Sequence, residues 1–361
     1  MKIIHPRPNP IVAAMYTLRD LDVDVIVVHG PSGCCFMASR MLEEAGVRVV
    51  TSGMKDSDLI FGGAESLTET LRLVKEKFDP ETVAVIGTCA SMIIGEDMEA
   101  CIREADIGCN VFPVMSHGCI GDNTEGAIKA LEAANKAGII STEEMNRQIN
   151  LMRSATQMEK AVGMASKEYL LPTRGKTKIG VCKRIIDAFS SGKRVACIML
   201  AKKELAFRYA DMFIALKQTR DALGGELYMI GDLDPNLGLP RIRGYATSIL
   251  SELKENGVEI EVIGGSDEYA LLGQRYKERV DEIKPDLLII MGIPHAYPEL
   301  SKDNILITDQ PRQMANYLSM GFESSVCEAS SHSLVMGAKS IVNLETADVL
   351  RELVADLQQQ D

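Results

Sequence analysis

The sequence predicts an α/β protein made of repeated Rossmann-like units, each with a buried parallel sheet. Short runs rich in Val and Ile alternate along the chain with longer stretches of helical periodicity. This alternation is typical of strand–helix–strand units, in which helices cover both faces of a parallel sheet. The chain has 361 residues, which is too many for one ordinary hydrophobic core. We therefore expect two or three such units in succession.

The first unit is expected over residues 1–137. Four runs have the length and β-branched composition of strands, namely 23–28 (VDVIVV), 47–52 (VRVVTS), 82–87 (TVAVIG) and 110–115 (NVFPVM). Between these runs, the segments 33–46, 66–78 and 123–138 have helical spacing of their apolar residues. The pattern predicts a sheet of four parallel strands joined by helices.

A polar stretch at 141–180 breaks this rhythm, and we interpret it as a connecting helix followed by a basic loop. The alternation then resumes. Its strand-like runs are 194–200, 226–231, 258–265 and 286–292, and its helical stretches are 204–225, 244–257 and 269–285. We expect a second unit over 138–230 and a third unit, with C-terminal helices, over 231–361.

Charge and composition exclude several classes of protein. The chain carries 51 acidic and 39 basic side chains, a formal net charge of -12, without a long basic run. This balance argues against binding to nucleic acid or to anionic membrane surfaces. The N-terminal sequence MKIIHPRPNP lacks the apolar core of a signal peptide, and no apolar run reaches the ~18 residues of a membrane span. We expect a cytoplasmic protein.

Cysteines follow three of the predicted strands. The chain has nine cysteines and no CxxC pair, so thiols or metal ligands are expected, but not a zinc ribbon or a ferredoxin-type loop. Cys34, Cys89 and Cys119 come directly after the first, third and fourth strand-like runs. Ligands of open α/β sheets bind at the carboxyl ends of the strands, and in a flavodoxin-like order the first and third strands are neighbours. Cys34 and Cys89 would then lie at adjacent loop tips.

The alternative role for a cysteine is to fill a gap in the core, since free Cys is among the most buried residue types. We favour this role for the cysteines within helix-like or strand-like stretches, which are Cys101, Cys109, Cys182 and Cys197. Cys35 directly follows Cys34, and adjacent residues on a helix point about 100° apart. One of the two is therefore expected to pack and the other to bind, and the sequence leaves open which.

The chain contains no recognisable nucleotide-binding loop. The turn GPSGCC, residues 30–35, lacks the Lys-Ser/Thr ending of a phosphate loop, and its proline disrupts the dinucleotide fingerprint. No later segment contains GxxxxGK. We expect no nucleotide site in this chain.

Two motifs together resemble a known family. HGPSGC, residues 29–34, followed by GTCASMIIGED, residues 87–97, is similar to the paired cluster-binding signatures of the nitrogenase component 1 superfamily. The resemblance implies the repeated α/β units of nitrogenase component 1 subunits. It also implies that Cys34 and Cys89 ligate a 4Fe-4S cluster.

Departures from the superfamily pattern indicate which branch of the superfamily this chain resembles. Relatives carry a third ligand upstream of His-Gly-Pro, whereas residues 5–22 of this chain contain no Cys. Cys327 and His332 do not fit the contexts of the residues that hold the iron-molybdenum cofactor, and the chain is short for a nitrogenase subunit. What remains similar is a compact branch found in methanogens, active in coenzyme F430 biosynthesis. The resemblance implies ATP-driven reduction of a nickel tetrapyrrole, Ni-sirohydrochlorin a,c-diamide, with lactam ring formation.

This branch implies partners and a substrate site. Electrons and ATP hydrolysis would come from a separate, homodimeric ATPase similar to the nitrogenase iron protein, and nickel would enter only as part of the substrate. His117 and His29, at the ends of the fourth and first strands, are candidate proton donors, with the alternative that both only cap their turns. Arg241 and Arg243, expected in a loop after the 226–231 strand, are candidate clamps for substrate carboxylates, with solvated surface arginines as the alternative.

The missing third ligand also predicts a homodimer. A two-fold axis through the cluster would supply Cys34 and Cys89 twice and complete four thiolates, with the ATPase docking near that axis. The alternative is a cluster within each subunit, completed by Cys35 or Cys119. Two rival functions stay open, a light-independent protochlorophyllide-type reductase subunit and a non-enzymatic scaffold for metal-cofactor assembly.

Overall fold

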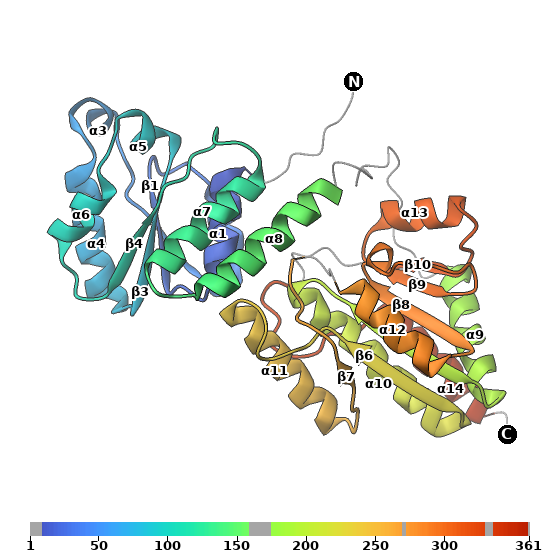
Figure 1. The fold of residues 1–361 in the computed structure, drawn as a ribbon. Coiled ribbons are helices and arrows are strands. Elements are labelled where there is room, and N and C mark those ends of the chain that lie inside the picture. Colours follow the sequence, from blue (N-terminus) through green and yellow to red (C-terminus); the bar gives the residue numbers. More distant parts are fainter. Residues whose placement is uncertain (1–8, 159–174, 269–271, 329–334, 360–361) are drawn as a thin grey trace. The chain divides into compact units, whose positions relative to one another are not determined.

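The computed structural model describes residues 9–158, 175–268, 272–328 and 335–359. Its contacts divide the chain into two compact units (Figure 1). The first consists of Met1–Arg153 with Leu239–Arg241, and the second of Ser154–Gly238 with Ile242–Asp361. Three units, with limits after residues 137 and 230, were expected from the sequence. The last two expected ranges instead share one continuous sheet, which makes them a single unit.

The first unit is built on a parallel sheet of four strands in the order β2-β1-β3-β4. The strands are β1 (Val25–His29), β2 (Arg48–Thr51), β3 (Thr82–Gly87) and β4 (Asn110–Val114). β1 lies beside β3, with His29 opposite Gly87. The four predicted strands and the flavodoxin-like neighbourhood of the first and third strands are therefore confirmed.

Helices cover both faces of this sheet (Figure 1). α1 (Pro10–Asp20) and α7 (Asn123–Lys136) pack together on one face, and α4 (Ala64–Phe78) and α6 (Met98–Ala105) pack together on the other. Three shorter helices follow the carboxyl ends of strands, and α8 continues beyond α7. Their bounds are α2 (Phe36–Glu44), α3 (Asp56–Phe61), α5 (Cys89–Ile93) and α8 (Thr142–Met158). The loops that follow β1 and β3 at this carboxyl edge are thereby anchored on buried strands.

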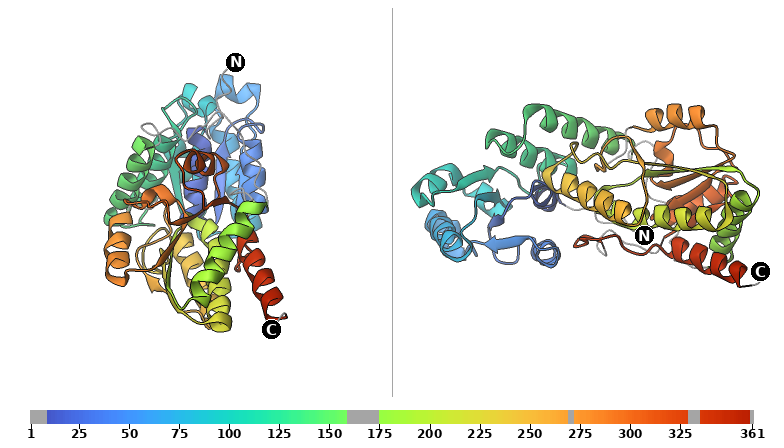
Figure 2. Two further views of the ribbon diagram at one scale, coloured as in Figure 1. Left: turned by 90° about the vertical axis from the view of Figure 1, so that its right-hand side faces the viewer. Right: turned by 90° about the horizontal axis from the view of Figure 1, so that it is seen from below.

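The second unit contains a parallel sheet of six strands in the order β10-β9-β8-β5-β6-β7. Its strands are β5 (Arg194–Leu200), β6 (Glu226–Gly231), β7 (Glu261–Val262), β8 (Leu287–Gly292), β9 (Ile305–Thr308) and β10 (Ser325–Cys327). Its α-helices are α9 (Lys176–Ser190), α10 (Ala206–Leu223), α11 (Pro240–Glu255), α12 (Gly273–Ile283), α13 (Pro311–Ser319) and α14 (Glu345–Gln358). α12 and α13, orange in Figure 2, lie on the opposite side of this sheet from α9, α10 and α14.

The structure also departs from the pattern expected for the second unit. The strand expected over 258–265 shortens to the two residues of β7, and β9 and β10 extend the sheet beyond the strands expected from the sequence. The basic loop expected before residue 180 lies partly outside the described residues, and α9 already begins at Lys176. Val181, Ile185 and Phe189 of α9 recur on one side of the helix and are fully buried, which explains why this stretch is helical.

Among the described helices, none is both long enough and apolar enough to span a membrane.

Candidate metal centre

Cys34 and Cys35 lie in the turn between β1 and α2. The amide of Cys34 donates to the carbonyl of Pro31 at 2.9 Å, and Cys35 adopts the left-handed conformation with φ 60° immediately before α2 begins at Phe36. A non-glycine residue in this conformation carries backbone strain. The two cysteines were expected on a helix, but both precede it. The expectation that their side chains diverge by about 100° on a helix therefore does not apply.

Cys89 is the first residue of α5, directly after β3. The hydroxyl of Thr88 donates to the carbonyl of His29 at 2.9 Å, which ties the β3 turn to the β1 turn. Gly30 makes this approach possible, because a Cβ at that position would lie 2.6 Å from Cγ2 of Thr88. The strand pairing and the absent side chain at Gly30 together bring the Cys34 and Cys89 turns side by side.

The neighbouring sulfur atoms affect the ionisation of Cys34 and Cys35. Burial raises the pKa of Cys34, and the neighbouring Cys89 sulfur raises that pKa further. Burial, followed by Cys34 and Cys89, raises the pKa of Cys35 to about 11. All three side chains are half-buried. Metal binding requires the thiolate form, so binding here would release protons and be favoured by higher pH.

The loop after β4 adds two further donors. Ligand atoms of Cys89, His117 and Cys119 all lie within 4.8 Å of one another. The amide of Gly118 donates to Sγ of Cys89 at 3.2 Å, and the amide of Cys119 donates to Nδ1 of His117 at 3.2 Å. The second bond fits the expectation that His117 caps its own turn. The sequence treated Cys119 and His117 separately, and the pairing of β3 with β4 brings both to Cys89.

His29 lies beneath these loops and is fully buried. Its Nδ1 lies 2.9 Å from Oγ of Ser52, and its Nε2 lies 3.7 Å from Oε2 of Glu96. Glu96 also accepts a hydrogen bond from the amide of Gly63 at 2.6 Å. Burial lowers the pKa of His29, although the Glu96 and Asp58 carboxylates oppose that shift. Sequence reasoning did not single out Glu96, the first acidic residue of the Ile-Gly-acid-acid motif.

The other cysteines mostly occupy core positions. Cys101, Cys182 and Cys197 are buried, as expected for residues that fill the core, and burial raises the pKa of each thiol. Cys109 is half-buried and precedes β4, so it lies outside the strand in which it was expected. Cys327 is buried on β10. His332, considered with it from the sequence, lies outside the described residues.

Arg241 and Arg243 lie in the first turn of helix α11. They were expected in a loop after β6, so that expectation was wrong. Proline at the first helical position is pre-organised for a helix, and Pro240 starts α11. Arg241 is half-buried and Arg243 is exposed. Sequence reasoning missed Pro240 as the signal for a helix start.

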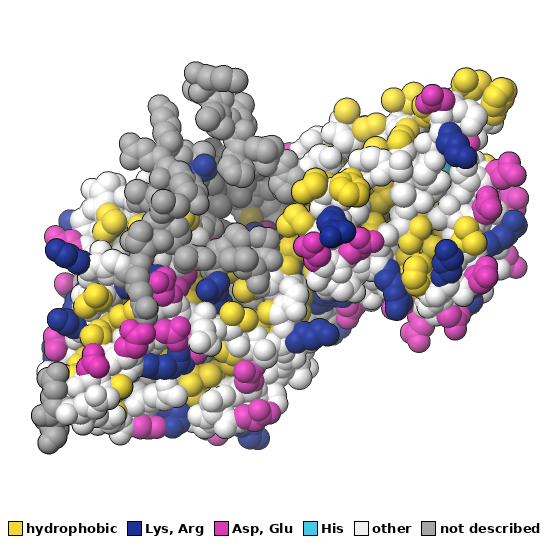
Figure 3. Space-filling view, turned by 180° about the vertical axis from the view of Figure 1, so that it is seen from behind, with side chains coloured by type: hydrophobic (Ala, Val, Ile, Leu, Met, Phe, Trp, Pro, Cys, Tyr) yellow, Lys and Arg dark blue, Asp and Glu magenta, His cyan; other side chains and the backbone are white. Residues whose placement is uncertain are grey.

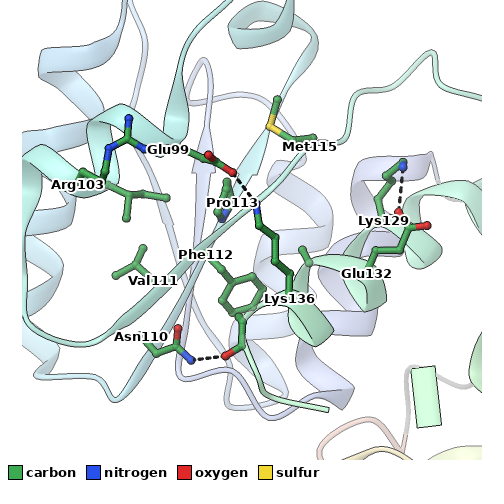
Figure 4. A pocket seen from close by; sticks show the side chains of 13 residues that line it. Glu99, Arg103, Asn110, Val111, Phe112, Pro113, Met115, Lys129, Glu132 and Lys136 are labelled. Carbon is green, nitrogen blue, oxygen red and sulfur yellow. Dashed lines mark hydrogen bonds and ion pairs between the residues drawn. The ribbon is translucent and has the colours of Figure 1, made fainter. Parts of the chain in front are cut away.

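A groove of about 470 Å³ runs along the outer edge of β4 (Figure 4). Its lining includes Val111, Phe112 and Met115. Lys129 and Lys136 stand at its rim, but each pairs with a glutamate at 2.9 Å. Both cations therefore already have carboxylate partners within the chain, which does not favour the groove as a site for an acidic tetrapyrrole.

Exposed apolar side chains surround the cysteine turns. We call this set the apolar rim. It comprises Phe36 and Met37 of α2, Ile60 and Phe61 of α3 and Ile93 of α5, with exposed fractions from 62% to 87%. α3 and α5 lie at the same end of the first unit, and Figure 3 shows hydrophobic side chains gathered at that end. Exposed apolar side chains that gather on one part of a surface are typical of an interaction site.

The residues present fit an iron–sulfur cluster. Thiolates are the usual protein ligands of such clusters, and Cys34, Cys35 and Cys89 are grouped in half-buried turns rather than enclosed in the core. The Gly118 amide directed at Sγ of Cys89 is a donor of the kind that tunes cluster potentials.

Comparisons with known proteins agree with these motifs. Residues 10–172 match the family model described as Nitrogenase component 1 type Oxidoreductase. Over 357 residues the chain is 44% identical to a protein of Methanothermobacter thermautotrophicus named Ni-sirohydrochlorin a,c-diamide reductive cyclase complex, component CfbD, covering 96% of this chain and 98% of that protein. Over 364 residues it is 43% identical to the protein of the same name from Methanosarcina acetivorans, covering 99% and 98%.

A solved structure named Nitrogenase Cp1 at pH 5 covers 99% of this chain and 89% of its own, with a TM-score of 0.36 and 15% identity. That likeness is too low to support an argument, and the full-length relatives decide the assignment. This chain belongs to the nitrogenase component 1 type oxidoreductase family, among the relatives named as component CfbD.

Proposed function

We propose that this chain is the cluster-bearing component of a reductive cyclase that reduces Ni-sirohydrochlorin a,c-diamide and closes its lactam ring in coenzyme F430 biosynthesis. The observation that carries this proposal is the convergence of Cys34 and Cys89 at neighbouring strand ends. The full-length relatives supply the substrate, since both are named as components of this cyclase complex.

A 4Fe-4S cluster is the group these cysteines would hold, and when bound it supplies electrons one at a time at low potential. In this proposal, Cys34 and Cys89 from each of two copies provide four thiolates across a two-fold axis. The apolar rim supports such an arrangement, because it surrounds these turns with side chains that a second copy would bury.

A separate ATPase similar to the nitrogenase iron protein would drive the reaction, because no phosphate-loop sequence occurs in this chain. It would dock near the two-fold axis, where electrons have the shortest path to the cysteines.

Protons and substrate contacts would come from this chain. His117 is half-buried beside Cys89, so we propose that it reaches substrate as a proton donor. His29 is fully buried, which favours a role in passing or holding protons behind the cysteine turns. Arg243 is exposed and remains a proposed partner for a substrate carboxylate. Arg241 pairs with Asp22 at 2.6 Å, so it would have to exchange that carboxylate for one of the substrate.

The direct test is anaerobic purification of the chain with its ATPase partner, followed by turnover of Ni-sirohydrochlorin a,c-diamide. We expect Cys34→Ala and Cys89→Ala to lose both iron–sulfur absorbance and turnover, whereas Cys109→Ala, the matched half-buried cysteine, retains both. Full iron content in Cys89→Ala would refute the ligand assignment. A wild-type protein that holds iron but neither binds nor reduces the tetrapyrrole would instead indicate an assembly scaffold.

A further inference from the structure

We propose that Cys89, His117 and Cys119 form a second, mononuclear site for a thiophilic divalent cation of the zinc class, within a single copy of the chain. The site uses the loop after β4, which the proposed shared cluster does not need. Its ligand set is two thiolates and one imidazole, a combination found in zinc sites that keep one position open.

Two features of the fold build this site. β3 and β4 are neighbouring parallel strands, with Ile86 opposite Val114, so the residues that follow both strands emerge at the same edge. The Gly118 amide then donates to Sγ of Cys89 at 3.2 Å and holds the β4 loop against the start of α5. A Cβ at Gly118 would lie 3.3 Å from that sulfur, which is a tight contact, so glycine suits this close approach.

The three ligand atoms are grouped more loosely than a bound ion would hold them. The three ligand atoms lie within 4.8 Å of one another. Zn–S bonds of about 2.3 Å and Zn–N bonds of about 2.0 Å place the ligands of a tetrahedral site roughly 3.5 Å apart. The remaining closure falls to Cys119, whose side chain is exposed on a turn, and to the His117 ring. Nδ1 of His117 accepts from the Cys119 amide, so ion binding would either open that bond or remove the proton from Nε2. Two thiolates balance the charge of a divalent cation, and solvent would supply the fourth ligand.

Cys89 belongs to both sites, so the cation and the cluster exclude each other. This competition, unlike the mononuclear site itself, rests on the proposed function. Zinc bound at the β4 loop would hold Cys89 away from the cluster and keep the chain in a cluster-free form.

Co²⁺ is the probe for this site, because it occupies zinc sites and its thiolate complexes absorb visible light. The full chain, stripped of metal by a chelator under reducing conditions, is titrated with Co²⁺ and then with Zn²⁺ as competitor. We expect one Co²⁺ per chain with thiolate charge-transfer absorption that Zn²⁺ abolishes. His117→Ala and Cys119→Ser should each weaken Co²⁺ binding at least about tenfold, since losing even an outer-shell partner of a metal ligand costs that much. Cys34→Ser and the control Cys109→Ser should bind Co²⁺ normally.

Comparing cluster uptake with cobalt binding in two variants separates this site from the cluster. After anaerobic reconstitution with iron and sulfide, we expect Cys119→Ser to take up a normal cluster and Cys34→Ser to take up none, with circular dichroism confirming that both are folded. Absence of a thiolate–cobalt band in the wild-type protein would overturn the mononuclear site. So would loss of that band in Cys34→Ser but not in Cys119→Ser, since the ion would then sit among Cys34, Cys35 and Cys89. Failure to form a cluster while cobalt binding is intact would count against the proposed function alone.

Discussion

At the scale of single residues, the site depends on a glycine without a side chain as well as on the cysteines. Gly30 lets the β1 turn touch Thr88, the residue before Cys89. Cys35 accepts a left-handed backbone directly before α2. Strain of this kind persists only where the surroundings fix it, and it is concentrated at functional sites.

Gly30→Ala is the direct test of this packing. The added Cβ would lie 2.6 Å from Cγ2 of Thr88, so we expect a loss of about 1–3 kcal/mol in the free energy of unfolding. The cysteine turns should also separate and the iron content fall. Gly33→Ala is the matched control in the same turn, because a Cβ added there would have nothing within 4 Å. Equal stability of the two variants, measured by urea unfolding, would contradict the tight contact.

His29 should make the stability of the first unit depend on pH. Its pKa lies below the ordinary 6.5 in the folded protein, mainly because of burial. Above pH 6.5 the imidazole is neutral in both states. As the pH falls from 6.5 toward the lowered pKa, only the unfolded state takes up the proton, so the free energy of unfolding decreases by up to about 1.4 kcal/mol per pH unit.

The measurement compares thermal unfolding midpoints of the wild-type protein and His29→Asn between pH 5 and 7. Groups that do not interact with His29 titrate alike in both proteins, so the wild-type midpoint should fall more steeply with acid. Parallel curves would mean that the pKa of His29 is the same in the folded and unfolded states, and a shallower wild-type curve would mean that folding raises it.

At the scale of elements, ion pairs join helices far apart in sequence. Lys178 of α9 is 1% exposed, and its Nζ lies 2.7 Å from Oε2 of Glu345 at the start of α14 and 3.5 Å from Oε1 of Glu328. Glu328 in turn accepts hydrogen bonds from the backbone amides of Glu345 and Thr346. The cation thereby neutralises a buried carboxylate that caps α14.

Lys178→Ala should leave the Glu328 carboxylate buried without its cation. Removal of one partner from a buried ion pair costs about 3–5 kcal/mol, and we expect a loss of that size in the unfolding of the second unit. Lys176→Ala, on an exposed position of the same helix, should change stability by less than about 0.5 kcal/mol. Urea unfolding followed by circular dichroism compares them, and a small effect in Lys178→Ala would show that Glu328 finds another donor.

At the scale of the whole molecule, the proposed pairing of two copies determines the cluster stoichiometry. A shared cluster gives about two irons per chain, whereas a cluster within each copy gives about four. Iron analysis combined with native mass therefore separates the two arrangements. A monomer that keeps its cluster would rule out sharing.

The apolar rim gives a second test of the same pairing. Phe61 is 87% exposed on α3, and Phe61→Asp would place a charge where the second copy is proposed to pack. We expect a folded monomer with little iron. Leu73→Asp is the control, since Leu73 is 43% exposed on α4, away from the carboxyl-end helices of the rim. A Phe61→Asp dimer with full iron would place the interface elsewhere.

Much of this protein follows from its sequence alone. The strands β1, β3, β5 and β8 are short, fully or almost fully buried apolar runs, and such runs are visible without any partner strand. The two cysteine motifs are equally local, since each is a strand end followed by a turn. Together they were sufficient to indicate the family and to predict that Cys34 and Cys89 converge.

Only the tertiary structure decided how these pieces combine. Strand order and register depend on pairings between distant segments, so local periodicity did not reveal that the residues after β4 meet Cys89, or that β5 to β10 form one sheet. The left-handed backbone at Cys35 and the burial of His29 beside Glu96 likewise arise from packing around them. The sequence determined which chemistry-bearing residues stand at strand ends, and the long-range pairing of parallel strands decided which of them share a site.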